Sequence, residues 1–162
     1  MIFGKEELVK EAVYEKYGLL YQLEHGMLSN HMWFEGAFGY HFYALTSFFA
    51  YEKFALHTPH SHIHHPNYKA MMELLFSYIE PGFRVPMLND TNYGHTSSIY
   101  YLYEFAYREI GGDKLLYVLK ELYKDEARDN LEAFIYGVDI LPTCDIVPVS
   151  YTHLRAHETL SD

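Results

Sequence analysis

The densest group of reactive side chains in the sequence is a run of histidines near its middle. Five imidazoles fall within nine positions, at His57, His60, His62, His64 and His65. Imidazole nitrogens bind zinc, copper and nickel, so metal binding is the first chemistry to consider. The spacing is irregular, and neither a cysteine nor a neighbouring acid completes a coordination set. We therefore interpret the run as a solvated loop between two helices and assign no metal site.

A second group combines aromatic and polar residues ahead of an apolar stretch. Trp33 and Glu35 precede the pair Tyr40-His41. An indole can stack on a sugar ring, and a histidine can contact a substrate or tune a neighbouring phenol. Each residue also has a structural interpretation: Trp33 as a packing residue, Glu35 as a loop anchor and His41 as a hydrogen-bonded core residue. For Tyr40 packing is the ordinary role, because the chain has seventeen tyrosines.

Polar residues also occur in the stretch between Arg84 and Asp90. Asn89 and Asp90 suit either side-chain hydrogen bonds that build a loop or polar contacts in a cleft. Arg84 is the nearest cation, and a solvated surface arginine is the alternative to a binding role.

The elements that must position these residues are predicted to be helices, because apolar residues recur at helical spacing. The first predicted segment is one amphipathic helix or a closely spaced pair, and the second is apolar almost all round, as in an inner helix. Ser97 or Ser98, and Asp113, are expected to cap helices, and Pro81-Gly82 to end one. No strand is expected before Ile146. The predicted helices span about residues 6–28, 38–56, 67–80, 97–110, 113–122 and 129–136.

Serial helices with wide apolar faces predict an all-α fold with helices stacked in pairs. A bundle and an α/α toroid both satisfy this pattern, and periodicity alone does not choose between them. No motif repeats at a fixed period, which argues against a simple solenoid.

Composition narrows the possible partners. The formal net charge of −10 argues against a nucleic-acid partner, which requires a basic face. No stretch of the sequence is long and apolar enough to span a membrane. The single Cys144 excludes an internal disulfide framework. An acidic substrate would have to meet a local basic site against the overall negative field.

Residues Trp33 to Leu45 resemble a pattern of the heparinase II/III and alginate lyase family. In that pattern an aromatic residue and a glutamate precede, by five residues, a Tyr-His pair that opens an inner helix. Three later stretches agree in order, so that the resemblance covers about residues 17 to 142. The matching segments are Gly18–Leu28 with Trp33–Leu45, Pro81-Gly82 with Pro86–Asp90, Leu102–Arg108, and Leu131–Gly137.

The resemblance implies a partial α/α toroid whose family β-sandwich domains are absent from this chain. It implies β-elimination on an acidic, uronic-acid-containing polysaccharide, without a cofactor, by a periplasmic or secreted bacterial enzyme. Tyr40 then corresponds to the catalytic tyrosine, which donates or accepts a proton. The sequence predicts neither the particular uronate nor the oligomeric state.

The substrate-binding residues follow from the same resemblance. Asn30 and His31 lie only ten and nine residues before Tyr40, too close to be the family's carboxylate-neutralising residue. We expect that residue upstream of Met1 and a later catalytic histidine downstream, so residues 1–148 are interpreted as a toroid fragment that is inactive alone. A non-catalytic helical carbohydrate-binding or scaffold module is the alternative. The candidates are Asn30, His31, Trp33, Glu35, His41, Arg84, Asn89 and Asp90.

The last fourteen residues, 149–162, depart from the helical pattern that precedes them. Residues 149–159 resemble a translated sequencing adapter read through in frame. We expect this tail to be non-native, and His153 and His157, although spaced for one helix face, are not interpreted as a metal site.

Overall fold

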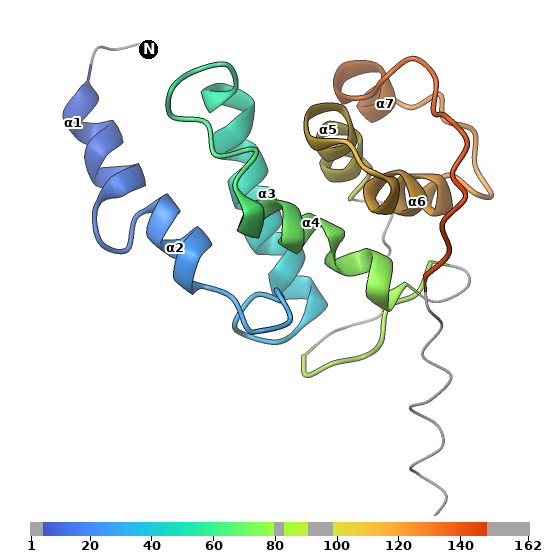
Figure 1. Ribbon diagram of the computed structural model, residues 1–162, viewed down its shortest axis with the longest axis horizontal. Helices are drawn as coiled ribbons and strands as arrows, with labels where there is room; N and C mark the ends of the chain where they lie inside the picture. The colour runs from blue at the N-terminus through green and yellow to red at the C-terminus, as the bar shows by residue number, and fades with distance from the viewer. Residues whose placement is uncertain (1–4, 80–82, 91–98, 149–162) are drawn as a thin grey trace, which may run out of the picture.

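The protein is all-α in the computed structural model, which describes residues 5–79, 83–90 and 99–148 (Figure 1). Within these residues an isolated antiparallel β-bridge joins Met27 and Trp33. No helix in the described part is long and apolar enough to cross a membrane. The elements are α1 (Glu6–Val9), the π-helical turn η1 (Lys10–Tyr14), α2 (Leu19–His25), α3 (Phe38–Ala55), α4 (Pro66–Tyr78), α5 (Tyr100–Ile110), α6 (Asp113–Leu122) and α7 (Leu131–Tyr136).

The helices follow one another across the molecule in chain order (Figure 1). Helices α1 and α2 lie at one end, α3 and α4 in the middle, and α5 to α7 at the other end. Helix α4 joins the two sides, because it contacts α2, α5 and α6. The long helix α3 packs on α4 through Phe48 and Tyr68, whose ring centroids are 6.0 Å apart. One apolar core therefore runs through α2 to α6.

Local sequence signals explain where several helices begin. Pro66 occupies the first turn of α4, where its missing N–H costs nothing, and His65 caps the helix by accepting a hydrogen bond from Asn67 N at 3.2 Å. Asn130 caps α7 by accepting from Ala133 N at 2.9 Å. The expected cap at Asp113 is wrong by one residue. Gly112, with φ of +106°, is the N-cap, and Asp113 is the first helical residue.

Most predicted helix boundaries agree with the structure within two residues. The main difference lies in the segment 6–28, where α1 with η1 and then α2 replace one continuous helix, in line with the predicted pair. The predicted caps at Ser97 or Ser98, the stop at Pro81-Gly82 and the tail 149–162 lie outside the described residues.

Helix α3 keeps an exposed apolar face although it runs through the core. Phe38, Leu45 and Phe49 are buried on one side, whereas Tyr43 and Phe54 on the other are each 75% exposed. The sequence predicted an inner helix buried on several sides, because its apolar residues encircle it; in the structure one side is buried and the other is exposed. This exposed face carries Tyr40 at its N-terminal end.

Candidate functional site

Tyr40 lies in the first turn of α3, with 43% of its surface exposed. Tyr43 follows three residues later and therefore lies on the same face of α3. Its ring is also exposed. Ala37 is the N-cap of α3 and supplies no side-chain hydrogen bond. The phenol of Tyr40 is therefore accessible on the exposed side of the helix.

His41, the next residue, points the opposite way into the core and is only 1% exposed. Its Nδ1 accepts a hydrogen bond from the backbone N–H of Trp33 at 3.1 Å, and its Nε2 lies 3.1 Å from the carbonyl oxygen of Met71 in α4. An acceptor at Nδ1 and a carbonyl opposite Nε2 require the neutral tautomer protonated at Nε2. Burial lowers the pKa of His41 to about 4, against a weaker opposing effect of the Met71 carbonyl. Both ring nitrogens are occupied within the protein.

Trp33 and Glu35 form a small unit in the loop before α3. The indole Nε1–H of Trp33 donates to Oε2 of Glu35 at 3.1 Å. The indole ring lies so close to Gly26 that a Cβ there would come within 2.5 Å of Trp33 Cζ3. Backbone hydrogen bonds from Leu28 N to Met32 O and from Phe34 N to Gly26 O close the loop at its base. The loop is thus a compact hairpin-like turn and not an open connection.

Asn89 ties this loop to a segment more than fifty residues further along the chain. Its side-chain N–H donates to the carbonyl oxygens of Glu35 at 3.3 Å and Gly36 at 3.0 Å. Asn89 and Gly36 both have positive φ, at +49° and +71°, which Asn and Gly tolerate best. The structure therefore brings the candidates Trp33, Glu35, His41 and Asn89 together, as loop-building residues at the start of α3, the helix that carries Tyr40.

The other candidates surround this unit less closely. Asn30 accepts from Met32 N at 3.1 Å and donates to the phenol of Tyr78 at 3.2 Å. His31 is exposed, with φ of +67°. Arg84 and Asp90 are also exposed.

The histidine run forms the loop between α3 and α4, as the sequence predicted. It borders an open pocket of about 420 Å³ whose lining includes His57, His64 and Glu109. Within the described residues, no three His, Cys, Asp or Glu side chains converge as a metal-binding group.

Sequence reasoning missed Glu52, the residue that organises this loop. Glu52 is 2% exposed, and its carboxylate accepts hydrogen bonds from Ser61 Oγ at 2.6 Å and His62 N at 2.7 Å. An acidic residue in the last turn of a nearly all-apolar helix was the signal that could have found it, because a buried carboxylate needs partners from elsewhere.

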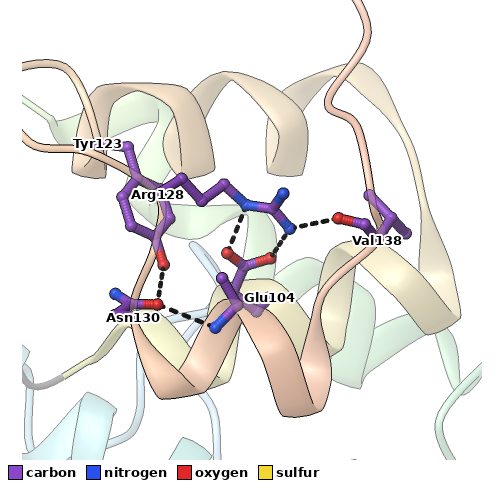
Figure 2. A network of polar contacts seen from close by, with 6 residues as sticks. Glu104, Tyr123, Arg128, Asn130 and Val138 are labelled. Atoms are coloured by element: carbon purple, nitrogen blue, oxygen red, sulfur yellow. Dashed lines mark hydrogen bonds and ion pairs between the residues drawn. The ribbon is translucent and has the colours of Figure 1, made fainter.

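A buried ion pair, also missed, joins α5 to the segments on both sides of α7 (Figure 2). Glu104 is 0% exposed and accepts two hydrogen bonds from Arg128, both at 2.7 Å. The same guanidinium donates to Val138 O at 2.7 Å. Tyr123 donates to the Asn130 oxygen that caps α7. Glu104 and Gly137 belong to the third and fourth segments of the family resemblance, and the network places them side by side.

Comparison with known proteins adds no relative. No protein-family model, curated protein or solved structure matches the chain.

Proposed function

We propose that this chain is part of the helical toroid domain of a heparinase II/III-like polysaccharide lyase, with Tyr40 as proton donor or base. The supporting observation is the placement of Tyr40, an exposed phenol at the start of a helix whose other side is buried in the core. The loop beside it is anchored and polar and contains the other residues of the motif. The paired-helix toroid is part of the proposal.

The proposed reaction is β-elimination at a uronic acid residue. A base removes the C5 proton, the electron pair forms the C4–C5 double bond, and the C4–O bond breaks while an acid protonates the departing oxygen. The substrate carboxylate must be neutralised so that the C5 proton becomes acidic. A phenol can give or take a proton, and proton transfer by a positioned side chain contributes about 10²–10⁴-fold to a rate. Tyr40 is the residue of this chain that we assign to that transfer.

The exposed face of α3 supplies a surface on which a sugar chain can lie. Tyr43 exposes most of its ring three residues after Tyr40. Aromatic rings form apolar walls for sugar rings, while Glu35 and Asn30 supply polar groups near the same end of the helix. We extend the proposal to an acidic polysaccharide substrate and a periplasmic or secreted location, both on the family resemblance.

The test is a substitution that removes only the phenol oxygen. In the complete enzyme encoded by the gene, Tyr40→Phe is expected to lower the formation of unsaturated uronate at least about 100-fold, followed by ultraviolet absorbance on heparan sulfate and alginate. Tyr17→Phe is the control, because it removes an exposed phenol that lies outside α3, and it should keep most activity.

Two results would count against this proposal. Undiminished turnover by the Tyr40→Phe enzyme would remove Tyr40 from the mechanism. Saturable binding of uronate oligosaccharides without any elimination would instead favour the non-catalytic binding module.

A further inference from the structure

We infer that His41 is a positioning residue, whose buried imidazole holds the first turn of α3, and with it Tyr40, in register with the Trp33 loop. It acts through other residues and does not touch the substrate. The importance of this register for catalysis rests on the proposed function, whereas the register itself is a property of the fold.

His41 ties the start of α3 to a neighbouring helix. It lies in the first turn of α3 together with Tyr40. Its Nε2 is 3.1 Å from the carbonyl oxygen of Met71 in α4. The imidazole therefore anchors the turn that carries Tyr40 to α4.

The other ring nitrogen of His41 binds the loop that precedes α3. Nδ1 of His41 accepts the backbone N–H of Trp33, which lies in the loop and not in the helix. One rigid ring thus fixes the distance between the loop and both helices. The indole of Trp33 in turn donates to the carboxylate of Glu35. Asn89, from a segment after α4, donates to the backbone carbonyls of Glu35 and Gly36.

The burial of His41 leaves no room for direct contact between its ring and a substrate. The side chain is 1% exposed, and both nitrogens already have partners at 3.1 Å. A substrate could reach either nitrogen only by replacing one of these contacts. The adjacent Tyr40, on the exposed side of the helix, is free of that restriction.

Two substitutions separate the two contacts of the ring. His41→Asn keeps an oxygen near the position of Nδ1, so it can accept from Trp33 but cannot reach Met71. His41→Gln can donate to Met71 O but places no acceptor at Nδ1. Trp33 is the single tryptophan of the chain and therefore reports on the loop by its fluorescence.

The experiment measures acrylamide quenching of Trp33 in the 162-residue chain, with His64→Gln as the control at an exposed histidine. We expect the quenching constant to rise toward that of free tryptophan in His41→Gln and to remain near wild type in His41→Asn and His64→Gln. Equal quenching in wild type and a folded His41→Gln chain would overturn the inference.

A second measurement serves if His41→Gln does not fold. Nitrogen NMR of the wild-type chain should show His41 protonated at Nε2, unprotonated at Nδ1, and unchanged between pH 5 and 8. A proton on Nδ1, or titration near the ordinary value of about 6.5, would overturn the inference.

In the elimination assay, His41→Gln and His41→Asn should each lower kcat about tenfold with little change in KM, because each loses one of the two hydrogen bonds that position the turn of Tyr40. A change confined to KM would instead indicate direct substrate contact and would overturn the positioning role. If no variant or wild type eliminates, the proposed function fails, while the fluorescence and NMR results still decide the role of His41.

Discussion

Two regions of this molecule join distant segments of the chain in different ways. The network around Glu104 and Arg128 uses a charged pair in the core, with two contacts at 2.7 Å (Figure 2). The loop around Trp33 and the start of α3 is held instead by a neutral imidazole, a carboxamide and backbone groups, together with the exposed carboxylate of Glu35, which accepts from the Trp33 indole. The first region is closed to solvent around Glu104, and the second leaves Tyr40 exposed.

The difference shows what each region can do. A buried carboxylate is tolerable only when it is paired, so the contacts of Glu104 with Arg128 are needed to keep this part of the core folded. The hydrogen bonds of the second region fix the loop and the start of α3 without a buried ion pair. The charged network is therefore structural, and the second region is suited to carrying a site.

The largest effect should come from breaking the charged network. Arg128→Met leaves the carboxylate of Glu104 buried without its partner, and we expect a loss of about 3–5 kcal/mol in the free energy of unfolding, measured by urea denaturation. The surface pair of Lys114 with Glu73, at 3.1 Å, is the control. Lys114→Met should cost less than about 1 kcal/mol. The double variant Glu104→Gln with Arg128→Met should recover part of the loss. Strict additivity of the two single changes would mean that the residues do not act as a pair.

Acid should lower the stability of the chain chiefly through His41, in the region around the Trp33 loop. His41 has a pKa of about 4 in the folded chain, against an ordinary value of 6.5. The unfolded chain therefore binds the proton more readily, and stability falls as the pH decreases from about 6.5 to about 4. The difference of 2.5 in pKa corresponds to about 3 kcal/mol.

The measurement is the urea midpoint across this pH range in wild type and His41→Asn. Burial also lowers the pKa of His62, which adds a slope of the same sign to both proteins. The steeper wild-type dependence should disappear from the variant, and parallel curves would show that His41 does not bind the proton as described.

The smallest effect should come from removing the hydrogen bonds that Asn89 donates to the Trp33 loop. Asn89→Asp keeps a residue that tolerates positive φ but removes the N–H group that donates to Glu35 O and Gly36 O. We expect a loss of about 1 kcal/mol in the free energy of unfolding. Asp90→Asn is the matched control at the exposed neighbour, and an equal loss there would mean that the Asn89 contacts contribute nothing.

Sequence patterns predicted the helices well and the contacts between them poorly. The bounds of α3, α5 and α6 follow from local signals such as the apolar run after Phe38 and the Gly111-Gly112 turn. The partners of Glu52 and Glu104 lie nine or more residues away, and no local signal specifies them. His41 illustrates the limit, because the sequence left open whether it was a core residue or a substrate contact, and its burial places it in the core.

The sequence by itself determined the all-α class, the positions of most helices and the loop character of the histidine run, because helix periodicity and turn residues are local properties. The tertiary structure alone decided which side of α3 is buried. Since α3 is apolar all round, only the packing of α4 and α5 against it could leave Tyr40 exposed and His41 enclosed. The tie between Asn89 and the Trp33 loop likewise depends on a chain path that no local spacing specifies.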